Sequence, residues 1–217
     1  MTAAPRLDSY EWAGGREAML RFGPDDGPIV VMALPLFEEA NRTRAFGVSI
    51  LRVLATRGIG GVLPDLPGQG ESEVATADVR LVDLTAAFAA VPGTRSVAIR
   101  SGALFVDARP CWVLSPQSGA ALARELARMK GDFADGDREE VAGNVIDREL
   151  LAALSNATHP GGGRGGTRTV RLASDPGVAD RHIPGQPLWR RAEPGNDFAL
   201  AEVLAADIAG WIASCEG

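Results

Sequence analysis

The sequence predicts a single-domain α/β protein with three layers, in which a mostly parallel β-sheet lies between helices on both faces. Two observations carry this prediction. Short apolar runs rich in β-branched residues alternate along the chain with longer segments whose apolar residues recur at helical spacing. These runs are apolar throughout, which is typical of strands buried on both faces of a parallel sheet. A length of 217 residues fits one domain over residues 1–217.

The first half of the chain supplies most of this pattern. Clusters of Gly, Pro and Asp separate the segments, as turns do. The order strand, helix, strand indicates βαβ units and therefore a parallel sheet. The elements predicted here are strands at residues 9–12, 17–22, 29–34, 59–63, 96–99 and 111–114 and helices over 41–57 and 79–91.

A small helical, cap-like insertion is expected at about residues 118–158. Two amphipathic segments, 119–130 and 148–157, flank an acidic stretch in which we predict no strand. A Gly-rich linker follows at 159–166. It lacks the Lys-Ser/Thr ending of a phosphate-binding loop, so a linker is the preferred interpretation.

Two more strands and a long helix end the chain. The strands are predicted at 167–173 and 180–184, and the amphipathic helix at 197–214. Only residues 174–179 separate the two strands, whereas a parallel crossover needs about a dozen residues or more. Either the pair is an antiparallel hairpin that turns at Asp175-Pro176-Gly177, or the crossover is shortened and has lost its helix.

The composition of the chain restricts the classes of partner that the protein is expected to bind. The net charge of −6 argues against nucleic acid or an anionic membrane surface. No apolar run reaches the roughly 18 residues of a membrane span, and the N-terminus lacks the apolar core of a signal peptide, so we expect a cytoplasmic protein. No sequence pattern indicates a cofactor or a metal. The oligomeric state cannot be read from the sequence.

A tight turn follows the strand at 96–99. There, Val97-Ala98-Ile99-Arg100-Ser101-Gly102-Ala103 leads from a short apolar strand directly into a helix of small residues. Elsewhere, segment 38–44 reads Glu-Glu-x-Asn-Arg-x-Arg, segment 65–72 reads Asp-x-Pro-Gly-x-Gly-x-Ser, and segment 185–189 reads Gly-x-Pro-x-Trp. The segment Val141-Ala142-Gly143 precedes one of the predicted helices.

These segments together resemble the α/β-hydrolase superfamily, and most closely the exosortase A system-associated hydrolases of the type 2 group. The likeness covers most of residues 28–215 and implies an α/β-hydrolase-like fold. It also implies a link to bacterial exosortase and exopolysaccharide functions. In such folds the turn at 97–103 is the nucleophile elbow, with the pattern Gly-x-Ser-x-Gly.

Two catalytic positions depart from the superfamily pattern. Arg100 stands where the nucleophile is expected, and a guanidinium stays protonated at any working pH. Pro187 stands where the resemblance places the catalytic histidine, and proline has no side-chain proton acceptor. Asp175 follows the next-to-last strand, where the catalytic acid could lie, but Asp-Pro-Gly is also an ordinary turn sequence, the interpretation we prefer.

Other serines offer a displaced nucleophile. Ser101 follows the elbow, and Ser115 and Ser118 follow the strand at 111–114, with His182 as the available base. Each serine also has a structural interpretation: Ser101 as a cap of its own short helix, and Ser115 and Ser118 as hydrogen-bonding loop residues. We prefer the structural interpretation for all three.

Arg100 itself has two interpretations. Residues Leu36, Phe37, Glu38 and Glu39 form the loop where an oxyanion hole is normally built, and either glutamate could pair with Arg100 and fill the site. Alternatively, Arg100 binds an anionic ligand. We prefer the internal pair.

Two functional hypotheses remain. The preferred one is a non-catalytic binding or accessory protein, with a small anionic, acyl or saccharide ligand. The alternative is a serine ester or acyl hydrolase that uses Ser101, Asp175 and His182.

Overall fold

The computed structural model describes residues 4–159 and 166–216. Its centre is an eight-stranded sheet. The strands in spatial order are β1 (Arg6–Trp12), β2 (Gly15–Phe22), β4 (Gly60–Pro64), β3 (Ile29–Ala33), β5 (Arg95–Ile99), β6 (Cys111–Leu114), β10 (Thr167–Leu172) and β11 (Arg181–Ile183). This spatial order follows the chain order except that β4 lies between β2 and β3.

The sheet is parallel except at its first edge. β1 pairs antiparallel with β2, and β2 pairs antiparallel with β4, whereas every pairing from β4 to β11 is parallel. The fold predicted from the alternating pattern is therefore confirmed: three layers around a mostly parallel sheet. The edge strand β1 begins earlier than expected, because Arg6 to Asp8 also pair with β2 although their side chains are exposed.

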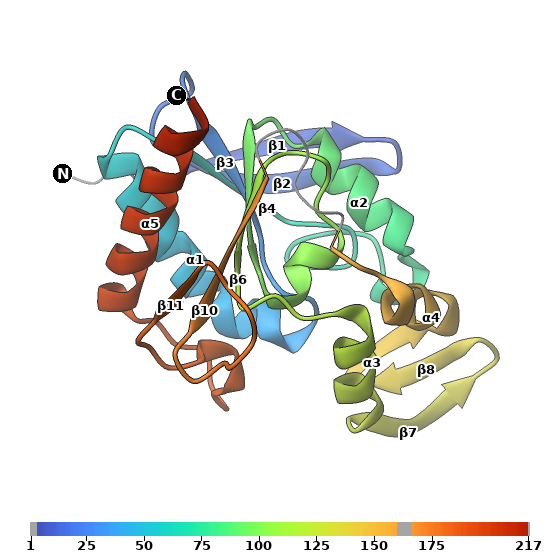
Figure 1. Ribbon diagram of the computed structural model, residues 1–217. Coiled ribbons are helices and arrows are strands. Elements are labelled where there is room, and N and C mark those ends of the chain that lie inside the picture. The colour runs from blue at the N-terminus through green and yellow to red at the C-terminus, as the bar shows by residue number, and fades with distance from the viewer. Residues whose placement is uncertain (1–3, 160–165, 217) are drawn as a thin grey trace.

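Helices α1 (Glu38–Thr56) and α5 (Phe198–Glu216) cover one face of the sheet, and α2 (Leu81–Ala90) covers the other (Figure 1). The strands divide their side chains between two cores. In β3, Val30 and Met32 join the core under α1 and α5, while Val31 and Ala33 join the core under α2. Successive side chains of a strand point to opposite faces, so an uninterrupted apolar run supplies both cores at once.

A buried carboxylate ties α5 to the sheet. Asp207 accepts a hydrogen bond from Trp112 Nε1 in β6 at 2.8 Å and pairs with Arg168 and Arg181 at 2.7 Å each. Burial by itself raises the pKa of Asp207, but the bonds from Arg168, Trp112 and Arg181 outweigh it and hold the pKa well below its ordinary value. By length and composition α5 could span a membrane, but one face of it, which includes Leu204 and Ile208, lies in the core.

The insertion differs from the prediction. Its two helices are present as α3 (Gly119–Ala127) and α4 (Arg148–Asn156), but a three-stranded antiparallel sheet lies between them, so the expectation of a purely helical insertion is wrong. The strands are β7 (Lys130–Asp135), β8 (Arg138–Val141) and β9 (Asn144–Asp147). Positive φ angles at Gly136 and at Ala142-Gly143 make its two tight turns.

At the end of the sheet the structure has the shortened crossover and not the hairpin. β10 and β11 are parallel, so the hairpin interpretation is wrong, and no helix connects them. The short connection suffices because Arg181 pairs with Val170, and β11 therefore lies beside only the last residues of β10. The connection therefore has to return only from the end of β10 to the level of Val170, and not along the whole length of the strand. Most of the expected linker at 159–166 lies outside the described residues.

Candidate functional site

The elbow is a sharp turn between β5 and the 3₁₀ helix η2 (Arg100–Leu104). Arg100 has a φ of 55°, in the left-handed region that a non-glycine residue rarely adopts. Gly102 lets the turn pack against β3, since a Cβ at this position would lie 2.4 Å from the carbonyl oxygen of Ala33. The chain therefore keeps the strained strand-to-helix geometry of a nucleophile elbow, with Arg100 at its tip.

The Arg100 side chain is held from several sides. Its Nε and Nη2 donate to the two carboxylate oxygens of Glu39 at 3.2 and 3.1 Å, and Nη2 also donates to Glu125 at 3.3 Å. The guanidinium carbon lies 5.3 Å from the ring centre of Trp189. Of the two arrangements left open for Arg100, the structure has the internal pair, and the partner is Glu39, whereas Glu38 is exposed.

The pair between Arg100 and Glu39 is mostly buried, and this burial affects the pKa of Glu39. The side chains of Arg100 and Glu39 are each 14% exposed. Burial raises the pKa of the Glu39 carboxyl, and the hydrogen bonds and charge of Arg100 offset only part of that rise. A bidentate pair of this kind leaves Glu39 dependent on Arg100, because an unpaired carboxylate is costly to bury.

A backbone donor beside the elbow is already occupied. Ser101 is completely buried, and its Oγ accepts the N–H of Leu36 at 3.0 Å, in the loop between β3 and α1. Ser101 is thus structural, but it caps this loop and not its own helix, because the short helix η2 turns the side chain back toward β3. In hydrolases of this fold a donor from this loop contributes to the oxyanion hole.

Ser115 and Asp175 form a second polar cluster at the ends of β6 and β10. Ser115 has a φ of 46°, is completely buried, and accepts the N–H of Leu172 at 3.5 Å. Asp175 pairs with Arg171 at 2.6 Å and accepts the N–H of Gly177, as a turn residue does. Burial acts to raise the pKa of Asp175, but the bonds from Arg171, Gly177 and Ser115 outweigh it and lower the pKa.

The structure does not bring Ser101, Asp175 and His182 together. His182 lies on the edge strand β11, is exposed, and its Nε2 lies 3.1 Å from the carbonyl oxygen of Gly177. Ser118 caps α3 by accepting the N–H of Ala121 at 3.2 Å. No hydrogen bond joins His182 to a serine in residues 4–159 or 166–216. His182 therefore contacts the connection between β10 and β11.

Pro187, at the expected histidine position, precedes the 3₁₀ helix η3 (Leu188–Arg190). This helix places Trp189 against Arg100, and Arg42 donates to the carbonyl oxygen of Trp189 at 3.2 Å. The Glu-Glu-x-Asn-Arg-x-Arg segment thus contacts the elbow through Glu39 and supports Trp189 through Arg42.

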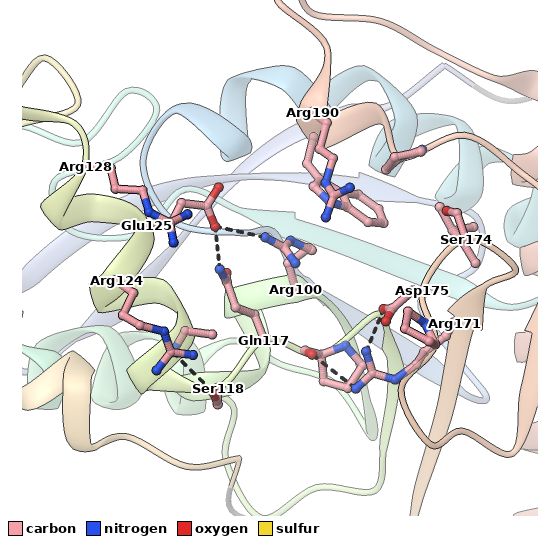
Figure 2. A pocket seen from close by; sticks show the side chains of 16 residues that line it. Arg100, Gln117, Ser118, Arg124, Glu125, Arg128, Arg171, Ser174, Asp175 and Arg190 are labelled. Carbon is pink, nitrogen blue, oxygen red and sulfur yellow. Dashed lines mark hydrogen bonds and ion pairs between the residues drawn. The ribbon is translucent and has the colours of Figure 1, made fainter.

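A cavity of about 500 Å³ opens beside Arg100. Figure 2 shows Arg124 and Arg128 on one side of Arg100 and Arg171 and Arg190 on the other. The sequence motifs pointed to Arg100, Ser118, Asp175, Pro187 and Trp189 in this wall. They did not point to the other arginines, for which the local signal was the spacing of Arg124 and Arg128 by one helical turn. The other lining residues are Pro116, Gln117, Ala121, Glu125, Leu172, Ser174 and Pro176.

A second cavity, of about 240 Å³, lies on the other side of the β3–α1 loop. Leu36, Phe37 and Glu38 line it together with residues of α1, the loop after β4 and the insertion. The loop residues named from the sequence therefore face two different spaces, since Glu39 turns to Arg100 instead. In the described part of the chain, no group of three or more His, Cys, Asp or Glu side chains is placed to hold a metal ion.

Solved structures resemble this chain over nearly all of its length. Est1E from Butyrivibrio proteoclasticus, solved with ferulic acid bound, matches with a TM-score of 0.61 at 14% identity, over 95% of this chain and 99% of that one. The esterase domain of a Rhodothermus marinus protein matches with a TM-score of 0.57 at 12% identity, over 96% and 98%. No protein-family model and no curated protein matches the sequence. At these identities the likeness shows the fold alone, and that fold is the α/β-hydrolase fold.

Proposed function

We propose that this α/β-hydrolase-fold protein binds a ligand beside its elbow and does not hydrolyse it. The observation that carries the proposal is Arg100 at the elbow tip, fixed by Glu39, Glu125 and Trp189. A guanidinium has no lone pair to attack a carbonyl carbon, and it keeps its proton at any working pH.

The neighbouring hydroxyl groups support the same conclusion. Ser101 and Ser115 are both 0% exposed, and each accepts a backbone N–H, so neither Oγ lies open to a substrate. A serine nucleophile also requires a base within hydrogen-bond reach, and His182 contacts the carbonyl oxygen of Gly177 instead. No observation favours the alternative of a displaced-nucleophile hydrolase.

The biological setting is proposed from the sequence motifs. The Glu-Glu-x-Asn-Arg-x-Arg segment and the arginine elbow resemble the exosortase A system-associated hydrolases, and in this chain they contact one another through Glu39 and Arg100. That contact gives the shared motif a structural purpose, which is to fill the elbow. We therefore infer an accessory role alongside exopolysaccharide or exosortase functions.

Ester turnover tests the absence of hydrolysis. Purified protein should hydrolyse p-nitrophenyl acetate and p-nitrophenyl butyrate no faster than the same protein carrying both Ser101→Ala and Ser115→Ala. Saturable turnover that either serine substitution abolishes would contradict the proposal. Circular dichroism of the variants shows that they are folded.

A further inference from the structure

The cavity beside Arg100 is positively charged in an otherwise acidic protein. Five arginines and two carboxylates line it, an excess of three positive charges, whereas the whole chain carries a net charge of −6. Arg100 and Arg171 are neutralised by Glu39 and Asp175. The side chains of Arg124, Arg128 and Arg190 make no hydrogen bond or ion pair with any residue that the structure describes.

Three unpaired guanidinium groups around one cavity form an arrangement suited to an anion. Arg124 lies in α3, Arg128 directly follows α3, and Arg190 is the last residue of η3, so their charges converge from opposite walls (Figure 2). Guanidinium binds carboxylate and phosphate groups through two parallel N–H donors.

A buried acceptor in the same wall indicates a second property of the ligand. Gln117 is 7% exposed, and its Nε2 donates to Glu125 at 2.7 Å. Its Oε1 is buried and has no hydrogen-bond partner among the described residues. The carboxylate of Glu125 fixes this orientation of the amide, since exchanging its ends would set two oxygens against each other. A buried acceptor without a donor is costly, and a hydroxyl group of a ligand would satisfy it.

We propose that this cavity binds a small carboxylate or phosphate that also carries hydroxyl groups, such as a sugar acid or a sugar phosphate. Arg124, Arg128 and Arg190 pair with the anionic group, and Gln117 accepts from a hydroxyl. The apolar surfaces of Trp189 and the neighbouring prolines contact the carbon skeleton. This inference rests on the proposed function, because it assigns the ligand of the same pocket.

Glu125 opposes the ligand in this scheme. It lines the cavity, its side chain is 43% exposed, and it already occupies Arg100 Nη2. An incoming anion is repelled by this carboxylate and competes with it for Arg100. Glu125→Gln removes the charge but leaves an amide oxygen to accept from Gln117 and Arg100, so it should strengthen anion binding.

Calorimetric titration at low ionic strength tests the proposal with D-glucuronate, glucose 6-phosphate and uncharged glucose. One or both anions should bind at least about tenfold more tightly than glucose. Whether D-glucuronate or glucose 6-phosphate binds shows whether the cavity takes a carboxylate or a phosphate. Arg124→Gln and Arg190→Gln should each weaken that binding about threefold, and Glu125→Gln should strengthen it about threefold, as expected for single partly solvated charges. Arg52→Gln and Glu202→Gln make the same charge changes on exposed faces of α1 and α5 and should leave the affinity unchanged.

The hydroxyl requirement has its own comparison. Cyclohexanecarboxylate, which lacks hydroxyl groups, should bind more weakly than D-glucuronate if the carboxylate arm binds, and Gln117→Met should reduce that difference. For a phosphate arm, cyclohexyl phosphate and glucose 6-phosphate make the equivalent pair.

Several outcomes would overturn the inference. These are equal affinity for glucose and both anions, no binding of either anion, a loss with Arg52→Gln as large as with Arg124→Gln, or no effect of Gln117→Met. Ester turnover with anion binding intact would refute the proposed function alone. Absence of both turnover and anion binding would refute the ligand assignment alone.

Discussion

Removing Arg100 from its pair with Glu39 should destabilise this protein strongly, because it leaves the Glu39 carboxylate buried without a partner. Replacing Arg100 with Met keeps much of the side-chain volume over Trp189 but removes both bonds to Glu39, whose side chain is only 14% exposed. Breaking a buried pair by removing one partner costs about 3–5 kcal/mol. We expect Arg100→Met to lower the free energy of unfolding by about 3 kcal/mol at pH 8.

The double variant Arg100→Met/Glu39→Met should recover most of that loss, because it leaves no buried carboxylate and places two flexible apolar side chains beside an aromatic ring. Denaturant unfolding of the wild type, both single variants and the double variant gives the coupling free energy, which should be about 2–3 kcal/mol. Arg16→Met is the matched control, since its pair with Glu11 is mostly exposed and should be worth less than about 1 kcal/mol.

The cost of Arg100→Met should also depend on pH. Burial already raises the pKa of Glu39, and removing Arg100 raises it further, so the folded state binds a proton more readily than the unfolded state. The penalty is full above the raised folded pKa and shrinks as the pH falls toward the ordinary value of 4.5. A pH-independent cost, a cost equal to that of Arg16→Met, or a double variant as unstable as the sum of the singles would refute this reasoning.

Three further substitutions probe the supports of the site, each read by denaturant unfolding. Asp207→Asn should lower the free energy of unfolding by about 2–4 kcal/mol at pH 7. Because the folded pKa of Asp207 is depressed, the stabilisation from its ionised carboxylate is present above the ordinary carboxyl pKa and fades as the pH falls below it. An equal cost of Asp207→Asn at pH 7 and pH 3 would contradict this assignment. Ser101→Ala should cost about 1–3 kcal/mol by leaving the Leu36 N–H without its acceptor, and an unchanged stability would show that water or another group replaces the hydroxyl. Gly102→Ala should cost about 1–3 kcal/mol, because the added Cβ would press against the Ala33 carbonyl oxygen. Gly210→Ala is the control, since open space surrounds this position in α5, and it should stabilise the protein by about 0.5–1 kcal/mol. Equal effects at the two positions would count against the tight elbow.

Much of the fold could be predicted from local pattern. β3 and β6 are apolar at every position, and β5 is apolar over its last three residues, because both faces of the sheet are covered. This signal needs no knowledge of distant residues. The sharp turn at Arg100 likewise follows from a strand that runs directly into small residues. The insertion was less predictable, since β7 is exposed along most of its length and carries no apolar alternation. Its Gly136 turn was the available signal.

The site was only partly predictable, because its decisive contacts join residues distant in the chain. The elbow and the Glu-Glu segment suggested a pair with Arg100, but the choice of Glu39 over Glu38 depends on how α1 begins at the end of β3. Ser101 was expected to cap its own helix, and its bond to Leu36 depends on the packing of η2 against β3. Gln117 follows β6 and Arg190 follows β11, and they line one cavity because these strands run in the same direction and end at the same edge of the sheet.

The measurement that tests the central claim most directly is intact-mass analysis after incubation with a serine-reactive fluorophosphonate. It needs no knowledge of a substrate, and it reports whether any serine of the folded protein is an activated nucleophile. The elbow geometry described above predicts an unchanged mass, because Arg100 occupies the nucleophile position and Ser101 is buried against Leu36. Stoichiometric labelling that Ser101→Ala or Ser115→Ala abolishes would contradict it.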